Sequence, residues 1–281
     1  MTIDASTRLA AVIGHPVRHS LSPAMHNAVF EQARLGWRFV AFDVVEGGAD
    51  AAIAAMPVLG IGGFAVTMPH KQQAADCVDE IDPSAAALGA VNTVVLRPDG
   101  STLGASTDGH GFVNSVVEAG CDVHGRRIVV LGAGGAARSI IDALGRSHAA
   151  DIAIVNRTAA AAEGAAALAP MARVGSLDDI ADADLLVNST SVGMGSDEVP
   201  IDPSFLHPGL VVADNVYHPL DTALLRAARA AGARTIDGLG MLAHQAALQQ
   251  ELWTGVRPDP RILRGAAERE LAAREPRVRS S

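Results

Sequence analysis

Arg127-Ile-Val-Val-Leu-Gly-Ala-Gly-Gly-Ala-Ala137 is the stretch that decides the fold of this 281-residue chain. The apolar run from Ile128 to Leu131 predicts a buried strand, and the small residues after it let the backbone turn tightly into a helix. This arrangement, with Ala137 as the third small position, is typical of a loop that holds a dinucleotide pyrophosphate at a helix N-terminus. The loop residues expected to face the cofactor are Gly132, Gly134, Gly135 and Ala136. A glycine-rich turn that only lets strand and helix pack closely is the alternative interpretation.

Alternating strands and helices extend from this loop in both directions. Downstream, strands are expected at residues 152–155, 185–187, 210–213 and 234–236, with helices at 136–144, 159–168 and 222–231. Upstream, strands are expected at 8–14, 39–45 and 63–67, helices at 23–35, 49–56, 69–78 and 111–118, and a hairpin at 89–106. Two C-terminal helices are expected at 240–253 and 260–274. The alternation predicts an α/β protein with largely parallel sheets.

Composition and charge argue against several classes of protein. With a net charge of −9 and a pI near 5.5, the chain lacks the basic stripe of a nucleic-acid-binding face. It has no long apolar run that could span a membrane, and its N-terminus lacks the basic start of a secretory signal, so a cytoplasmic protein is expected. Cys77 and Cys121 have no zinc-ligand spacing and are interpreted as two buried thiols, although a disulfide stays open. No metal site is expected.

The second strand after the glycine loop ends at Asn156-Arg157-Thr158. An NAD-binding enzyme usually places an acid here for the ribose hydroxyls, and an acid would repel a 2′-phosphate. Asn156 and Arg157 instead offer a hydrogen bond and a cation, which favours NADP over NAD. The alternative is that Arg157 is only a solvated loop residue.

Lys71 is the single lysine of the chain, and the other 21 of the 22 basic residues are arginines. Arginine does not release a proton in a protein, whereas a lysine can be tuned to do so. Lys71 is therefore a candidate for proton transfer. The alternative is that a single lysine remains at this position by chance, without a function.

Polar residues follow the predicted strands of the N-terminal half in three segments. These are His19-Ser20-Leu-Ser22-Pro23, Val66-Thr67-Met-Pro69-His-Lys71 and Ser106-Thr107-Asp108-Gly109. Together with Asn92 they supply hydroxyls, an amide, an ammonium and a carboxylate. Such a set suits a small polyhydroxylated acid at the carboxyl ends of parallel strands.

At these residues the chain resembles the shikimate dehydrogenase family, and the resemblance spans nearly its whole length. The matching stretches are residues 13–27, 66–71, 89–93, 107–112, the glycine loop, 156–158, 188–194, 214–219 and 238–245. The resemblance implies an N-terminal substrate domain of residues 1–109, completed by 240–281. It also implies a Rossmann NADP-binding domain of residues 110–239, and C-terminal helices that pack back on the first domain.

The resemblance also implies roles for individual residues. Lys71 and Asp108 are similar to the catalytic pair, and Ser20 and Ser22 to the pair that holds the substrate carboxylate. The remaining substrate residues are Thr67, Asn92, Tyr217, which is the only tyrosine, and Gln245. The cofactor residues are those of the glycine loop with Asn156, Arg157, Thr158, Thr190, Gly238 and Met241, and 188–194 resembles the wall around the nicotinamide.

The activity implied is NADP-dependent, reversible reduction of 3-dehydroshikimate to shikimate in aromatic amino-acid biosynthesis, by a monomer or homodimer. A quinate/shikimate or aminoshikimate dehydrogenase, whose pocket tolerates an added hydroxyl or a ring amine, is the first alternative. Use of NAD also stays open, because Ala159 to Ala162 lack the second basic residue of a 2′-phosphate clamp. Ser106, Ala65 and His218 each stand where the family often has Asn. A ligand-sensing module without catalysis would not require Lys71 and Asp108. A folate-type dehydrogenase of related architecture finds no support in the serine pair and Gln245.

Overall fold

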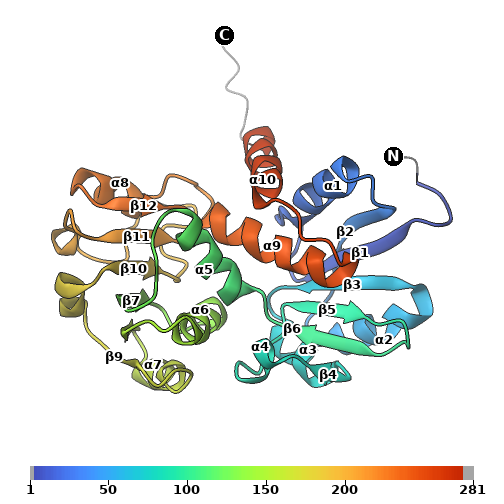
Figure 1. Cartoon of the computed structure of the whole chain (residues 1–281), viewed down its shortest axis with the longest axis horizontal. Coiled ribbons are helices and arrows are strands. Elements are labelled where there is room, and N and C mark those ends of the chain that lie inside the picture. Colours follow the sequence, from blue (N-terminus) through green and yellow to red (C-terminus); the bar gives the residue numbers. More distant parts are fainter. Residues whose placement is uncertain (1–2, 275–281) are drawn as a thin grey trace, which may run out of the picture. The chain divides into compact units, whose positions relative to one another are not determined.

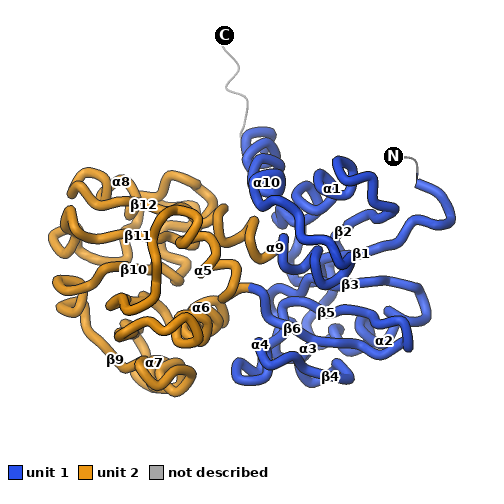
Figure 2. Tube along the Cα trace, viewed as in Figure 1, with its two compact units in different colours: residues 1–107, 246–281 blue, residues 108–245 orange. Residues whose placement is uncertain are grey.

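The computed structural model describes residues 3–274, which form two compact units (Figures 1 and 2). Unit 1 contains the residues up to Thr107 and those from Ala246 onward, and unit 2 contains Asp108 to Gln245. The sequence predicts domain boundaries after residue 109 and after residue 239, whereas the compact units divide after Thr107 and after Gln245. The helix α9 (Gly238–Thr254) contributes its first residues to unit 2 and its last turns to unit 1.

Unit 1 is built on a six-stranded sheet. Its other elements, in chain order, are β1 (Arg8–Gly14), α1 (Ser22–Gln32), β2 (Trp37–Asp43), α2 (Ala49–Leu59), β3 (Ile61–Val66), α3 (Lys71–Cys77), β4 (Glu80–Ile81), α4 (Pro83–Ala86), β5 (Thr93–Leu96), β6 (Thr102–Ala105) and α10 (Pro260–Arg274). The strand order is β2-β1-β3-β5-β6-β4. The pairs of β1 with β2 and β3 and of β4 with β6 are parallel, whereas β5 runs antiparallel to β3 and β6 as the predicted hairpin requires.

The central strand β1 is buried on both faces, as expected for a parallel strand between helices. Ala11 and Ile13 face a cluster that includes α2 and α3, and Ala10 and Val12 face a cluster that includes α1 and Trp253 of α9. The Trp253 indole donates to the Val94 carbonyl oxygen at 3.1 Å. A Cβ at Gly63 would lie 2.2 Å from the same indole nitrogen, so only glycine fits there. The last turns of α9 are therefore part of the core of unit 1.

Unit 2 contains a second six-stranded sheet, which is parallel throughout. Its elements are α5 (Asp108–Glu118), β7 (Arg127–Leu131), α6 (Gly135–Arg146), β8 (Asp151–Val155), α7 (Ala159–Ala166), β9 (Ala172–Val174), the 3₁₀ helices η1 (Leu177–Asp182) and η2 (Pro203–Phe205), β10 (Leu185–Asn188), β11 (Val211–Asp214), α8 (Ala223–Ala230) and β12 (Arg234–Ile236). The order β9-β8-β7-β10-β11-β12 is that of a Rossmann fold. The strand order reverses between β7 and β10, where such folds bind nucleotides.

The strand that precedes the glycine loop contributes alternate residues to the two faces of this sheet. Ile128 and Val130 pack in a cluster with residues of α5, α6 and α7, while Val129 and Leu131 pack with residues of η1 and α8. Both faces are thus covered by helices, as the continuous apolar run predicts.

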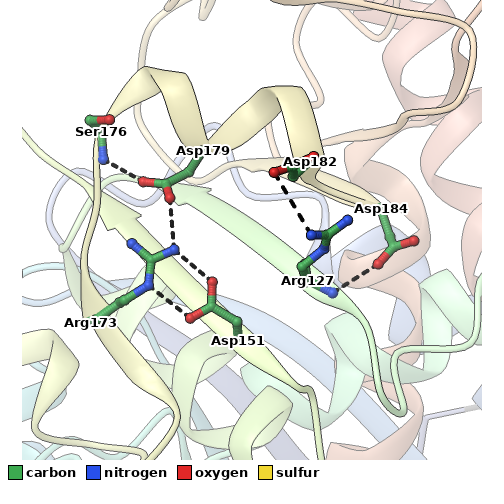
Figure 3. A network of polar contacts seen from close by, with 7 residues as sticks. All are labelled: Arg127, Asp151, Arg173, Ser176, Asp179, Asp182 and Asp184. Atoms are coloured by element: carbon green, nitrogen blue, oxygen red, sulfur yellow. Dashed lines mark hydrogen bonds and ion pairs between the residues drawn. The ribbon is translucent and has the colours of Figure 1, made fainter.

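Ion pairs join Arg127 and Asp151, at the amino ends of β7 and β8, to residues of β9 and η1 (Figure 3). Arg173 binds Asp151 through two hydrogen bonds of 2.8 and 2.7 Å and Asp179 through one of 2.7 Å. The Ser176 backbone N–H donates to the second carboxylate oxygen of Asp179 at 2.7 Å. The polar groups of this network therefore bind one another, and Arg127 and Asp151 stand at the opposite ends of their strands from the glycine loop and Asn156.

Among residues 3–274, no helix is long and apolar enough to cross a membrane, and no cluster of His, Cys, Asp or Glu is arranged to hold a metal ion. Cys77 and Cys121 are both free thiols, so the disulfide alternative is wrong. Cys121 is buried whereas Cys77 is only half-buried, so the expectation of two buried thiols is wrong for Cys77.

Candidate active site

The predicted substrate residues of unit 1 lie at one edge of its sheet. Ser20 and Ser22 follow β1, and Thr67 and Lys71 follow β3, so both pairs come after the carboxyl ends of parallel strands. Asn92 precedes β5, which is antiparallel to β3, and the Val66 N–H donates to the Asn92 carbonyl oxygen at 2.7 Å. The antiparallel hairpin therefore brings Asn92 to the same edge.

The serine loop, defined as His19 to Ser22, ends at the first turn of α1. Ser22 is the first residue of this helix and is buried, and its N–H donates to the Ser20 hydroxyl at 3.2 Å. No acidic residue occupies the first turn of α1. Hydroxyl groups beside a helix N-terminus favour an anion, since the first backbone N–H groups of a helix have no intrahelical acceptor.

The serine loop is also held by α10. Arg274 donates to the carbonyl oxygen of His19 at 2.6 Å and to that of Ser20 at 3.1 Å, and it pairs with Glu270 one turn earlier at 2.9 Å. The sequence does not predict this contact, because nothing near Arg274 distinguishes it from the other arginines of α10.

The turn between β3 and α3 carries Thr67 and Lys71 and is anchored at several points. The Thr67 N–H donates to the Ile13 carbonyl oxygen at 3.0 Å, and the Lys71 carbonyl oxygen accepts from the Val91 N–H at 2.9 Å. A Cβ at Gly14 would lie 2.4 Å from the Thr67 methyl group, so glycine lets Thr67 approach β1. Lys71 is half-buried and begins α3. Its position is therefore set by the backbone of two neighbouring segments, the end of β1 and the residues before β5.

Asn92 is buried in a network of hydrogen bonds. Its amide oxygen accepts from the Thr107 N–H at 2.9 Å and from the Thr93 hydroxyl at 2.7 Å, and its Nδ2 donates to the Thr107 hydroxyl at 2.9 Å. Gln249 of α9 donates to the Asn92 carbonyl oxygen at 3.2 Å and to the Thr93 hydroxyl at 3.1 Å. This role of Gln249 was not predicted, although it lies one helical turn after the predicted Gln245.

In unit 2, Asp108 is the first residue of α5, and Gln245 lies in α9. The two helices are in close contact, because a Cβ at Gly111 would lie 2.6 Å from the Gln245 backbone nitrogen. At the other end of α5, His244 and Glu118 form a hydrogen bond of 2.8 Å. The structure thus brings together the helices that carry these two predicted residues.

The glycine loop joins β7 to α6 as predicted. Gly132 has a φ of +106°, which favours glycine, and a Cβ there would lie 2.9 Å from the Ser189 carbonyl oxygen. A Cβ at Gly134 or at Gly135 would meet nothing within 4 Å. No side chain caps the N-terminus of α6, and its first turn has no acidic residue. This uncapped helix end, with open space over its glycines, fits the pyrophosphate of a dinucleotide; Ala136 follows in the first turn.

At the end of β8, no acidic residue stands where an NAD-binding enzyme usually has one. Asn156 is half-buried and donates through Nδ2 to the Thr158 carbonyl oxygen at 3.0 Å. Arg157 and Thr158 are exposed, and the first turn of α7 contains no acid. The exposed guanidinium can therefore meet a phosphate group without competition from a neighbouring carboxylate.

The segment from Asn188 to Met194 is tied to the ends of β10 and β11. Asn188 accepts from the Thr190 hydroxyl at 2.7 Å and donates to the buried Asp214 at 2.9 Å. Asp214 also accepts from the Thr222 hydroxyl at 2.7 Å and from the Val216 N–H at 3.0 Å. Burial nevertheless raises the pKa of the Asp214 carboxyl above its ordinary value.

The loop that carries Tyr217 contacts the start of α9. A Cβ at Gly238 would lie 2.6 Å from the Asn215 carbonyl oxygen, so glycine permits this approach. Met241 lies one turn further along α9, on the side that packs in the cluster with α5 and α6. The structure therefore brings the helix with Gly238 and Met241 next to the Tyr217 loop within unit 2.

Comparison with known proteins identifies the family. Models of the shikimate dehydrogenase substrate binding domain, of shikimate / quinate 5-dehydrogenase and of the shikimate 5′-dehydrogenase C-terminal domain match residues 12–94, 114–194 and 238–268. The shikimate dehydrogenase (NADP(+)) of Moorella thermoacetica is 44% identical over 266 residues, which cover 90% of each chain. The chain belongs to the shikimate dehydrogenase family. The predicted family and the α/β fold with a Rossmann unit and returning C-terminal helices are thus confirmed.

Solved structures agree with this assignment. A shikimate dehydrogenase in complex with NADP⁺ has a TM-score of 0.90 and 38% identity, covering 96% of this chain and 97% of its own. A 5-ketofructose reductase of Gluconobacter sp. strain CHM43 has a TM-score of 0.87 and 34% identity, covering 95% of this chain and all of its own (100%). Because the same fold carries different named activities, the substrate must be argued from the side chains of the site.

Proposed function

We propose that this protein is an NADP-dependent shikimate dehydrogenase, which reversibly reduces 3-dehydroshikimate to shikimate. The observation that carries this proposal is the edge of the unit 1 sheet where the serine pair, Thr67, Asn92 and the only lysine follow or precede adjacent strands. The 44% identical relative from Moorella thermoacetica has this activity by name. A sensing module without catalysis would have no use for Lys71, so this alternative is set aside.

The substrate is a carboxylic acid with several ring hydroxyls, and the polar edge offers a partner for each kind of group. Ser20 and Ser22, at the N-terminus of α1, hold the carboxylate. Thr67 and Asn92 of unit 1, with Tyr217 and Gln245 of unit 2, bind hydroxyl groups. A site built to hydrogen-bond hydroxyls rejects analogues that lack them, because its polar groups would then be left unpaired.

Catalysis requires that a proton enter or leave the reacting oxygen as hydride moves at the attached carbon. In the reductive direction Lys71 directs its ammonium at the carbonyl oxygen and supplies the proton, and in the oxidative direction it accepts it. Asp108 accepts a hydrogen bond from the same hydroxyl. General acid–base assistance of this kind contributes roughly 10²–10⁴-fold to the rate.

NADPH supplies the hydride when bound. The open glycines and the uncapped N-terminus of α6 receive its pyrophosphate. Asn156, Arg157 and Thr158 bind the adenosine ribose and its 2′-phosphate. The segment that contains Thr190, with Gly238 and Met241 at the start of α9, forms the nicotinamide side.

One observation favours use of NAD beside NADP, as in the second candidate, a quinate/shikimate dehydrogenase that also uses NAD. The first turn of α7, which begins at Ala159, contains no second cation beside Arg157. Arg157 is exposed and contributes a single charge to the discrimination between the two cofactors. A cytoplasmic location and a monomeric or homodimeric state remain predictions.

Initial rates with shikimate and with quinate, each with NADP⁺ and with NAD⁺, test both candidates. A high kcat/KM for the combination of shikimate and NADP⁺, and for none of the other three, supports the proposal. Preference for quinate or for NAD⁺ would leave the family intact and select the second candidate. Absence of turnover with all four combinations would contradict both.

A further inference from the structure

The first turn of α5, which begins with Asp108, receives its cap from another helix. The Gly109 N–H donates to the Ser139 hydroxyl at 2.9 Å, and Ser139 belongs to α6. The first backbone N–H groups of a helix have no acceptor within the helix, and a Ser or Thr side chain just before the helix usually supplies one. Here the acceptor comes from a residue 30 positions later in the sequence, and it is buried.

The same turn is confined on two sides by backbone. A Cβ at Gly109 would lie 2.1 Å from the Ser139 carbonyl oxygen and 2.8 Å from the Ala143 Cβ, so the backbones of α5 and α6 touch. Gly111, two residues later and therefore on roughly the opposite face of the helix, touches α9 at Gln245. The two glycines permit both approaches, and the Ser139 hydroxyl supplies the polar contact at the α6 side.

Ser139 lies one turn beyond the glycine loop, on the helix whose N-terminus receives the pyrophosphate in the proposed function. We propose that Ser139 is a positioning residue for the reaction: it fixes the Asp108 turn to the cofactor-binding helix, so that the carboxylate keeps its place relative to the cofactor. This inference rests on the proposed function, because it assigns Asp108 to catalysis. The contact that carries this role is the hydrogen bond from the Gly109 N–H to the Ser139 hydroxyl.

A positioning role differs from a purely structural role in what it changes. Loss of an ordinary cap lowers the stability of unit 2 and leaves turnover of the folded enzyme unchanged. Loss of a cap that positions Asp108 lowers kcat of the folded enzyme, while KM for NADP⁺ stays unchanged because the glycine loop is intact. A fall in kcat without a change in KM for NADP⁺ therefore indicates the positioning role, whereas unchanged values of both indicate the structural role.

The experiment compares Ser139→Ala and Ser139→Cys with wild type. For Ser139→Ala we expect kcat for shikimate oxidation to fall about tenfold. This is the factor expected if the free-energy cost of losing one helix cap is added to the activation free energy of the reaction. Ser139→Cys keeps a side chain of similar size that is a weaker hydrogen-bond acceptor. Its kcat should therefore lie between that of wild type and that of Ser139→Ala. Ser176→Ala is the matched control, because Ser176 caps the 3₁₀ helix η1 of the same unit, accepting from the Asp178 N–H at 3.3 Å; its kcat should equal that of wild type.

Asp108→Asn is measured in parallel, so that failure of each proposal is distinguishable. Wild type without shikimate turnover would contradict the proposed function, and an Asp108→Asn variant with normal kcat would remove Asp108, and with it the role of Ser139, from catalysis. If Asp108→Asn is inactive while folded Ser139→Ala keeps normal kcat, only the positioning role is wrong. Should Ser139→Ala not fold, Ser139→Cys decides, and a wild-type kcat in that variant would overturn the inference.

Discussion

The two units use different chemistry at the edges of their sheets that are proposed to bind ligands. In unit 2 the edge consists largely of backbone: an open glycine loop, an uncapped helix N-terminus and a strand end without an acid. In unit 1 the edge consists of side chains, namely serine, threonine, asparagine and lysine, each held by backbone contacts from neighbouring segments. A pyrophosphate can be bound by N–H groups that every sequence supplies, whereas a particular sugar-like acid requires particular side chains.

The largest expected effect follows from removing the proton-carrying group of unit 1. Lys71→Ala should lower kcat by roughly 10²–10⁴-fold, the contribution of general acid–base catalysis. Lys71→Arg keeps a positive charge that does not release a proton, so it should also be slow if proton transfer matters and active if only charge matters. Single-turnover rates measure this, and circular dichroism checks folding. Near-normal kcat in Lys71→Ala would contradict the assignment of this residue.

The second prediction concerns the free energy of unfolding of unit 1 in acid. His26 is fully buried in unit 1, stacked on Phe39 with ring centroids 4.3 Å apart, and its Nδ1 accepts from Gln250 at 2.9 Å. Burial lowers the pKa of His26 to about 3. In the unfolded chain the pKa is near 6.5, so below this value the unfolded state binds the extra proton and stability falls with falling pH. The expected loss between pH 7 and pH 5 is about 2 kcal/mol.

Tryptophan fluorescence can follow this loss in unit 1 alone, because both tryptophans, Trp37 and Trp253, lie in the same cluster as Phe39. Urea unfolding at a series of pH values gives the free energy of unfolding. The His26→Gln variant should lose the dependence between pH 7 and pH 5, whatever its absolute stability. An unchanged dependence in this variant would assign the effect to other groups.

The third prediction concerns Arg157, the side chain proposed to distinguish NADP from NAD at the sheet edge of unit 2. Arg157→Ala should raise KM for NADP⁺ about tenfold or more, since a hydrogen bond to a charged group is worth about 1.5–3 kcal/mol, and should leave KM for NAD⁺ unchanged. Arg146→Ala is the control, because Arg146 pairs with Asp142 at the far end of α6. Equal changes in KM for NADP⁺ and for NAD⁺ would show that Arg157 does not bind the 2′-phosphate.

The smallest expected effect concerns the support of the serine loop in unit 1. Arg274→Ala removes both hydrogen bonds to the carbonyl groups of His19 and Ser20, and KM for shikimate should rise about threefold to tenfold, as for the loss of a partly exposed charge-assisted contact. The kcat should not change. Arg264→Ala, which removes a comparable pair with Glu268 on the same helix, should leave both parameters unchanged. A fall in kcat without a change in KM would contradict this role.

Much of the fold could be predicted from the sequence because its signals are local. Apolar runs predicted the strands β1 and β7, and the hairpin predicted at 89–106 contains the antiparallel pair of β5 and β6. The strands β4 and β9, of two and three residues, were not predicted, because they are too short to show a period. The helix α9 was predicted as a single element, but nothing in its sequence indicates that the two units share it.

The sequence by itself determined the glycine loop, the missing acid after β8, the single lysine and the family, because each is readable from residues adjacent in the chain. Only the tertiary structure decided that Ser139 caps the helix of Asp108, that Arg274 holds the serine loop and that Gln249 supports Asn92. These contacts join residues 30, 255 and 157 positions apart. Their formation depends on how helices cross and strands pair, which is set by the packing of the whole core and leaves no periodic signal at either partner.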